Sequence, residues 1–415
     1  MIDFNDYVIQ AHKINKICGQ PRMGFSNIIE MQTGLLAVAS LEMHSVCTIT
    51  LDSFTRVNNF EAPLIARKNN KPLNGYPIVS YSINETKDMI DEIFEKFKKP
   101  IQVRHGSSKP SQIFQRLVDV GISATEGGPI SYCLPYSQTP IREAVREWQK
   151  SIEIFQSIGS SAHIESFAGC MLGQLCEPTL LNSLNILEGI FFQKHGLQSM
   201  SFSYAQGTSS IQDYAALAAL QLLIKKYLPS IRHHIVLYSY MGVFPETILG
   251  STRVIRDSVR VAKKASVSRI IVKTPLESKR IPSIVENIAS LEFVDHCYAD
   301  EVDELYLDIG ERDRIFNDAC VLIDSVLSLD SEIANCLSSA FNKGILDVPY
   351  CIHPDNKNKT QVMIDEKGYL KWSSIGHMPI SKSSCIDVKN SGSMSHIFLN
   401  SLHFTRKKYD SLKIN

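Results

Sequence analysis

The sequence lacks the features that would place it in several large protein classes. No two of its ten cysteines form a C-x-x-C pair, and no cluster of cysteine and histidine has the spacing of a zinc site. The first residues, MIDFNDYVIQ, have neither the basic start nor the long apolar run of a secretory signal peptide. No apolar stretch reaches the roughly 18 residues of a membrane-spanning helix. We therefore expect reduced, mostly buried thiols and a cytoplasmic location.

An excess of charge of one sign is also missing. The 43 basic residues balance the 43 acidic residues, so the sequence predicts no surface for nucleic acid and none for a membrane. Hydrophobic residues make up 44% of the chain, which is typical of globular proteins. The 415 residues suffice for one large α/β barrel with an appendage, or for two domains.

Short apolar runs alternate with amphipathic segments over most of the chain, which is typical of a parallel sheet. The predicted strands are 46–51, 101–103, 163–164, 199–203, 234–238 and 269–272, with weaker candidates before Arg22 and at 121–125. The predicted helices are 85–97, 110–120, 141–158, 210–227 and 251–264. No G-x-G-x-x-G follows the first strand, which argues against an open doubly wound sheet.

Each of the eight predicted strands ends on a polar or charged residue. In chain order these are Arg22, Asp52 with Arg56, Arg104, Glu126, Glu165, Tyr204, Tyr238 and Lys273. A barrel of eight parallel strands carries its active site at these ends. We predict an α/β fold, a (β/α)8 TIM barrel over residues 1–300 that holds the substrate site. A C-terminal helical and hairpin appendage with a weakly ordered tail is expected over 301–415, its hairpin at 362–372.

Three arginines, Arg22, Arg56 and Arg104, follow successive strands. A guanidinium is a planar fork of donors that binds a carboxylate through two hydrogen bonds. Taken singly, each arginine is more often a surface or salt-bridged residue. Three at neighbouring strand ends predict a site for an anion with two carboxylates, or for a phosphate.

Glu126 stands in the segment ATEGGPISYCLPY, shortly before Tyr132 and Tyr136. A carboxylate beside an arginine cluster can hold an ammonium group, and tyrosine hydroxyls can orient carboxylate oxygens. This set suits an amino dicarboxylic acid. The competing interpretation is a glycine turn with a structural ion pair and two core tyrosines. His105 is a further candidate, although a lone histidine is more often structural.

Lys273 and Glu277 follow the last predicted strand, in the segment IIVKTPLE. A lysine at a strand end suggests a Schiff base, as in an aldolase. Lysine with glutamate four residues later also suits hydrogen bonding to a ribose diol. The residues alone leave both interpretations open.

An ordered set of motifs resembles one known family. The motifs are QPRxG, DSFTR, LNGYP, RHG, EGGxISYxxPY, EWQ, IQDxAAL, MGxFP, KTPxExxxIP, NKGILDVPY and GYLKW, from about residue 17 to about residue 380. The series resembles the epsilon, or large, subunit of glutamate mutase, also called methylaspartate mutase. This resemblance implies a (β/α)8 barrel and an isomerase that uses adenosylcobalamin across the barrel mouth.

The resemblance also implies a partner and site residues. The cofactor would be held mainly by a small sigma-type subunit with an Asp-x-His-x-x-Gly motif, which this chain lacks; the family suggests a heterotetramer containing a dimer of large subunits. The residues that match substrate-binding positions are Arg22, Arg56, Arg104, His105, Glu126, Tyr132 and Tyr136. Those that match cofactor-contacting positions are Gly24, Asn74, Pro135, Phe244, Lys273, Glu277 and Ile281. The match of Lys273 and Glu277 to ribose contacts weighs against an aldolase.

The implied reaction is the radical isomerisation of L-glutamate to threo-3-methyl-L-aspartate, with Glu126 as a catalytic residue that exchanges a proton with the amino group. Several residues depart from the family's pattern, among them Met23, Cys133, Tyr238, Tyr240 and Arg280. Two alternatives follow. One is a divergent cobalamin mutase that acts on a related amino acid in a biosynthetic pathway. The other is a non-catalytic barrel that binds an amino acid.

Overall fold

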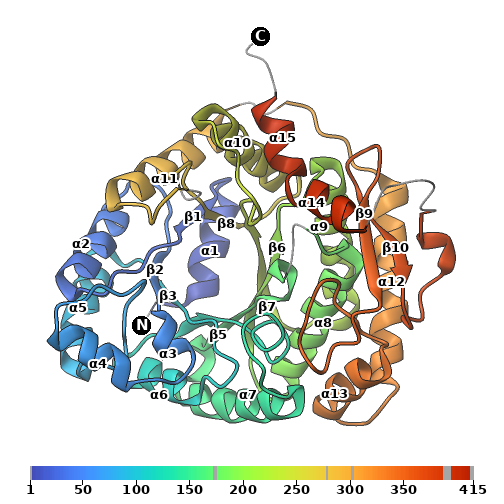
Figure 1. Ribbon diagram of the computed structural model, residues 1–415. Coiled ribbons are helices and arrows are strands. Elements are labelled where there is room, and N and C mark those ends of the chain that lie inside the picture. Colours follow the sequence, from blue (N-terminus) through green and yellow to red (C-terminus); the bar gives the residue numbers. More distant parts are fainter. Residues whose placement is uncertain (1, 172–174, 277–278, 301–302, 387–393, 412–415) are drawn as a thin grey trace.

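Eight parallel strands form a barrel at the centre of the molecule (Figure 1). The computed structural model describes residues 2–171, 175–276, 279–300, 303–386 and 394–411. Neighbouring strands pair in the order β1-β8-β7-β6-β5-β4-β3-β2, and a parallel bridge between Gly19 and Ser45 closes the ring. The strands are β1 (Cys18–Pro21), β2 (Cys47–Thr50), β3 (Ile101–Arg104), β4 (Ala124–Glu126), β5 (His163–Ser166), β6 (Ser199–Ala205), β7 (Arg232–Tyr238) and β8 (Arg269–Val272). The predicted TIM barrel is confirmed.

Helices surround the barrel and cover the outer face of the strands (Figure 1). Those between and after the strands are α2 (Ile28–Ala39), α3 (Ser53–Arg56), α4 (Glu61–Lys68), α5 (Ile83–Glu92), α6 (Ser111–Val120), α7 (Ile141–Phe155), α8 (Pro178–Lys194), α9 (Ser210–Tyr227), α10 (Ile248–Lys264) and α11 (Ile284–Ala299). Short π or 3₁₀ segments are η1 (Ile93–Phe97), η2 (Gln156–Ser161) and η3 (Ala168–Cys170). The sequence explains where two of the helices begin. Ser82 and Ser283 form capping boxes that satisfy the first amide groups of α5 and α11.

The first helix, α1 (Phe4–Lys13), closes the amino-terminal end of the barrel. The Phe4 ring lies 4.7 Å from the ring of His163, near the start of β5. Asn5 Oδ1 lies 2.8 Å from Nδ1 of His234 in β7. Because this end is filled by α1, the open end of the barrel is the one at which the strands finish.

After α11 the chain packs against the outside of the barrel. The elements are α12 (Ile309–Leu327), α13 (Ile333–Lys343), β9 (Thr360–Ile364), β10 (Leu370–Ile375), η4 (Lys382–Ser384), α14 (Met394–Leu402) and α15 (Phe404–Asp410). Strands β9 and β10 pair antiparallel, which confirms the predicted hairpin. The Gln212 side chain bonds both backbone groups of Leu370, at 2.7 and 2.9 Å, and so attaches the hairpin to α9.

All ten cysteines are free thiols and nine are buried, as the sequence predicts. The helices within the described ranges are too short or too polar to traverse a lipid bilayer. Across the same ranges, no three histidine, cysteine, aspartate or glutamate side chains gather in a way that would bind a metal ion.

Candidate active site

The predicted strand-end residues lie at the open end of the barrel. Parallel pairing aligns Thr50 with Arg104 and Glu126 with Glu165, so residues at or next to the ends of neighbouring strands lie side by side. Tyr238 is the last residue of β7 and pairs with Ile271 in β8, two positions before Lys273. The strands therefore gather basic, acidic and aromatic side chains around one opening.

Glu126 is the centre of this arrangement and is buried. Arg104 Nε donates to Glu126 Oε2 at 2.8 Å, and the Tyr132 hydroxyl donates to Oε1. Tyr238 adds a hydroxyl donor 2.8 Å from Oε2. Burial raises the pKa of Glu126, but the Arg104 guanidinium and the hydrogen bonds outweigh it and hold the pKa below its ordinary value. The structure thus brings Arg104 and Tyr132 together around the ionised carboxylate of Glu126.

Arg56 and Arg22 reach the same opening from the two preceding strand ends. Arg56 closes α3, and its Nε donates to the Leu51 carbonyl at 3.0 Å. Its Cδ lies 3.5 Å from where a Cβ on Gly106 would stand, which places the side chain over the loop after Arg104. Arg22 and Arg104 are cations near Tyr136. Tyr136 is half-exposed, and its ring meets that of Tyr132 edge-on.

His105 is fully buried beside this cluster rather than at its surface. Its ring contacts Phe114 and Tyr132 edge-on and stacks on Trp148. Burial lowers the pKa of His105 to about 3, so the ring is neutral at physiological pH. Nδ1 accepts from the Ser107 amide at 3.0 Å, which leaves the proton on Nε2. His105 can therefore donate one hydrogen bond, but it is unsuited to act as an acid.

Glu188 in α8, which the sequence interpretation missed, positions the loop that carries Tyr132. Its carboxylate accepts from the amides of Ile130 and Ser131 at 3.0 and 2.8 Å and from the hydroxyls of Ser131 and Ser166. A Cβ on Gly128 would stand 2.2 Å from this carboxylate. Gly128, the second glycine of EGG, is thus needed because the carboxylate of Glu188 occupies the space that a side chain would fill.

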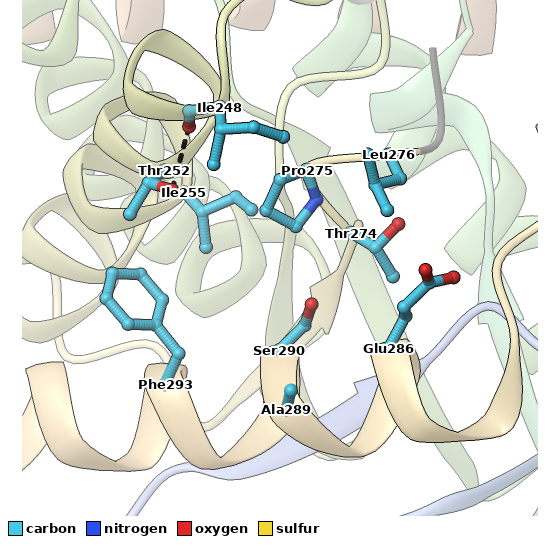
Figure 2. A pocket seen from close by; sticks show the side chains of 10 residues that line it. All are labelled: Ile248, Thr252, Ile255, Thr274, Pro275, Leu276, Glu286, Ala289, Ser290 and Phe293. Carbon is cyan, nitrogen blue, oxygen red and sulfur yellow. Dashed lines mark hydrogen bonds between the residues drawn. The ribbon is translucent and has the colours of Figure 1, made fainter. Parts of the chain in front are cut away.

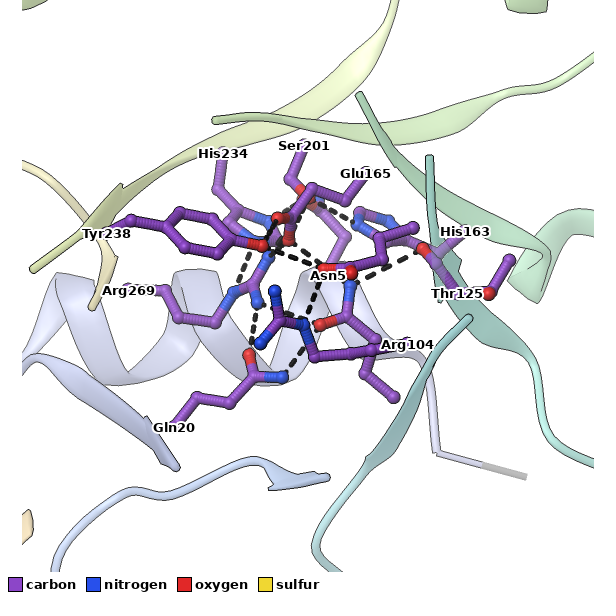
Figure 3. Close-up of polar contacts among 12 residues, drawn as sticks. Asn5, Gln20, Arg104, Thr125, His163, Glu165, Ser201, His234, Tyr238 and Arg269 are labelled. Carbon is purple, nitrogen blue, oxygen red and sulfur yellow. Dashed lines mark hydrogen bonds and ion pairs between the residues drawn. The ribbon is translucent and has the colours of Figure 1, made fainter. Parts of the chain in front are cut away.

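A second group of charged side chains lies inside the barrel, where Arg269, Glu165 and Tyr238 point toward one another (Figure 3). Arg269 and Glu165 form an ion pair in which both side chains are fully buried. Around the pair, Gln102 Nε2 donates to Glu165 Oε2 at 3.2 Å, and Arg269 Nε donates to His234 Nε2 at 3.1 Å. The Tyr238 hydroxyl lies 2.5 Å from Glu165 Oε1, which connects this group to the site. Glu165 was visible as a strand-end acid, whereas Arg269 begins its strand and gave no such signal.

The described candidate cofactor contacts lie in segments that follow the strands. Gly24 lies where a Cβ would be 2.4 Å from the Thr50 carbonyl, and the exposed Asn74 accepts from the Ser53 amide at 3.0 Å. Pro135 is half-buried next to Tyr136. Ile281 is exposed, and Glu277 lies outside the described residues.

Two further candidates line a cavity of about 500 Å³ at the ends of β7 and β8. Lys273 Nζ lies 5.3 Å from the centre of the Phe244 ring. Gly242, Glu246, Lys279 and Arg406 complete much of the lining. A cavity of this size, with an aromatic wall and several donors, fits a nucleoside.

A smaller cavity of about 270 Å³ lies between α10 and α11 (Figure 2). Apolar side chains such as Ile255, Leu276 and Phe293 form most of its walls. Its one carboxylate, Glu286, is paired with Arg280 and caps α11. This cavity therefore offers apolar surface and no reactive group.

Comparison with known proteins was consistent with this geometry. A family model described as Methylaspartate mutase E chain (MutE) matches residues 2–392. The chain is 28% identical over 382 residues to the glutamate mutase epsilon subunit of Yersinia enterocolitica, covering 88% of this chain and 78% of that protein. It is 26% identical to the same subunit of Escherichia coli O157:H7, covering 91% and 81%. It is 28% identical to the glutamate mutase epsilon subunit of Halobacterium salinarum, and this match covers 80% of this chain and 71% of that protein.

Proposed function

The chain belongs to the methylaspartate mutase E chain family, and from this membership we propose that it is the large subunit of an adenosylcobalamin-dependent isomerase that converts L-glutamate to threo-3-methyl-L-aspartate. The observation that carries the proposal is the buried Glu126 carboxylate, bonded by Arg104 and Tyr132 at a barrel mouth that also holds Arg22 and Arg56. This set has the charges that an amino dicarboxylic acid requires.

The arginines bind the two carboxylates of the substrate. Arg104 is fixed by Glu126, and Arg56 is fixed by the Leu51 carbonyl, so both present their remaining N–H groups in preset directions. A preset guanidinium loses little side-chain entropy when it binds. Tyr136, near Arg22, adds a hydroxyl at the half-exposed side of the site.

Glu126 binds the substrate ammonium group. Three donors occupy its two oxygens and keep it ionised, and among the described residues only Tyr132 donates to Oε1, which has a second acceptor position for the ammonium. During the reaction Glu126 exchanges a proton with the amino group of the substrate fragment. An isomerisation consumes no proton overall, so a nearly enclosed carboxylate that takes a proton and returns it suits the chemistry.

The mouth residues would hold the cofactor. Gly24 follows β1 and Asn74 lies in the connection after β2, whereas Phe244 and Lys273 follow β7 and β8, of which β8 is the neighbour of β1; Glu277 follows Lys273 by four residues. When bound, adenosylcobalamin supplies the carbon radical that starts the rearrangement. A small sigma-type subunit holds the cobalamin, and two such pairs form a heterotetramer around a dimer of large subunits.

A mutase that acts on a related amino acid is the second candidate, and one departure from the family's pattern favours it. Tyr238 bonds Glu126 directly, so it alters the surroundings of the ammonium site. Met23 instead packs its sulfur against Gly34 of α2, and Arg280 pairs with Glu286. Of these three departures, Tyr238 is the one that touches the proposed site.

The test is to combine this chain with a small cobalamin-binding subunit, adenosylcobalamin and L-glutamate, and to follow products by NMR. Formation of 3-methylaspartate is the expected result. Turnover of another amino acid, with none of glutamate, would replace the substrate but keep the class of enzyme. Binding of glutamate without cleavage of the cobalt–carbon bond would instead identify a non-catalytic binding barrel.

A further inference from the structure

Helix α15 lies beyond the part of the chain that the family model matches, yet it contacts the barrel mouth. The match ends at residue 392, and α15 spans Phe404–Asp410. The helix lies beside α10 (Figure 1). Tyr409 donates to Asp257 of α10 at 2.6 Å, and Lys408 Nζ donates to the Thr208 carbonyl at 3.2 Å. The tail of the chain is thus attached to α10 and to the connection between β6 and α9.

Asp410 fixes the segment between β7 and α10. Its carboxylate accepts from the Glu246 amide at 2.9 Å, from the Thr247 amide at 3.1 Å and from the Thr247 hydroxyl at 2.6 Å. These amides precede α10 and have no partner within that helix. The segment also carries Phe244, which lines the 500 Å³ cavity. Asp410 therefore helps to shape one wall of that cavity.

Arg406 forms part of the same cavity directly. Its Nη1 lies 3.0 Å from Oε1 of Glu246, and about a third of its side chain is exposed. The residue lines the cavity together with Phe244 and Lys273. A guanidinium carries five N–H donors, and the ion pair with Glu246 leaves most of them available to a ligand.

We propose that α15 is the outer wall of the nucleoside-binding part of the cofactor cavity, and that Arg406 donates hydrogen bonds to the nucleoside. The proposal rests on the proposed function, because the nucleoside is the adenosyl group. An adenosyl group offers ring nitrogens and hydroxyl oxygens as acceptors and a flat apolar face. The cavity offers the matching donors from Arg406 and Lys279 and the aromatic surface of Phe244.

The test compares two cobalamins that differ in the nucleoside. Binding of adenosylcobalamin and of methylcobalamin, which has no adenosyl group, is measured by absorbance in the complex of the full-length chain with its small subunit. Arg406→Gln should weaken adenosylcobalamin binding roughly tenfold, the effect of one charged hydrogen bond, and leave methylcobalamin binding unchanged. Lys407→Gln is the matched control, since it removes the same charge from the same helix but does not line the cavity.

The outcomes distinguish failure of the role of α15 from failure of the proposed function. Unchanged adenosylcobalamin binding in Arg406→Gln would overturn the proposal, as would an equal loss for both cobalamins or an equal loss in Lys407→Gln. If the unaltered chain with its small subunit binds no adenosylcobalamin, the proposed function itself fails. If the unaltered complex binds and turns over while Arg406→Gln behaves identically, only the role of α15 fails.

Asp410→Asn is a second test of α15 as a wall of the cavity, and it leaves Arg406 unchanged. Loss of the carboxylate charge should weaken the bonds to the Glu246 and Thr247 amides. Amide hydrogen exchange at residues 242–250 should become faster, and adenosylcobalamin binding should weaken more than methylcobalamin binding. Faster exchange with equal effects on both cobalamins would count against α15 as a wall for the nucleoside.

Discussion

The hydroxyl of Tyr238 lies 2.8 Å from Oε2 of Glu126. The same hydroxyl lies 2.5 Å from Oε1 of Glu165, which pairs with Arg269 inside the barrel. A hydroxyl has one proton, and ionised carboxylates only accept, so Tyr238 divides one donor between two acids. The proposed ammonium site is in this way connected to the buried ion pair, and a change at Tyr238 should affect both.

Tyr238→Phe should therefore lower turnover and stability together. The two buried carboxylates lose the one donor that they share, and a lost hydrogen bond to a charged group corresponds to roughly tenfold in kcat. The Michaelis constant for the amino acid should change less, because the arginines that bind its carboxylates remain. Steady-state kinetics and thermal unfolding measure the two effects.

The matched control for this variant is Tyr204→Phe. Tyr204 is also buried, on the neighbouring strand, but its hydroxyl donates to Asp213 at 3.1 Å, away from Glu126. The Tyr204→Phe variant should be less stable than the unaltered protein and should keep its turnover. Equal kinetic losses in the two variants would mean that Tyr238 acts through general packing and not through Glu126.

Glu126→Gln should lower kcat by about 10²-fold or more, because an amide cannot take a proton from the substrate amino group. The amide also offers Arg104 and Tyr132 one acceptor oxygen where the carboxylate offers two. Product formation in the assembled enzyme is the measurement, with circular dichroism to establish folding. Near-normal turnover in a folded protein would remove Glu126 from the proposed chemistry.

The barrel could be predicted because each strand is short, apolar and followed by a polar residue. Strand β8 and helix α9 begin and end where the sequence predicts, and the other predicted strands are off by a few residues. Helix α8 was missed because almost all of its residues from Pro178 to Phe192 are buried, which removes the alternation of polar and apolar faces. Helix α1 was also missed, and its contacts with His163 and His234 at the amino-terminal end of the barrel become visible only in the fold.

The candidate site could be predicted only in part. Arg104, Glu126 and Tyr132 were found because they follow strands and their contacts involve neighbouring connections. Glu188 and Arg269 lie far from them in sequence, at a helix centre and a strand start, where a charged residue is ordinarily solvated. Only the fold shows that these two side chains are buried and bonded to the site or to the second group of charged side chains.

Glu188 should make stability depend on pH. Burial raises the pKa of Glu188 to about 7 from 4.5, despite donors from Ser131, Ser166 and Ile130. Between pH 4.5 and 7 the folded protein keeps a proton that the unfolded chain has released. The contribution of Glu188 is therefore complete below pH 4.5 and is lost as the pH rises to about 7.

The comparison with Glu188→Gln isolates this effect. The variant cannot titrate at this position, so its free energy of unfolding should lack the decline, and the difference from the unaltered protein should change by a few kcal/mol, in order of magnitude, across the window. Asp213, whose pKa burial also raises to about 7, is present in both proteins and cancels. Parallel pH profiles from chemical denaturation would show that Glu188 does not hold its proton in the folded state.

Arg269→Met should be among the most destabilising single changes inside the barrel. It leaves the Glu165 carboxylate buried without its cation, a change that lowers the free energy of unfolding by about 3–5 kcal/mol. The double variant Glu165→Gln with Arg269→Met removes both charges and should recover much of that loss. Urea denaturation of the single and double variants gives the coupling energy between the two residues. Additive losses would mean that the two side chains stabilise the barrel independently and that the ion pair contributes no coupling energy.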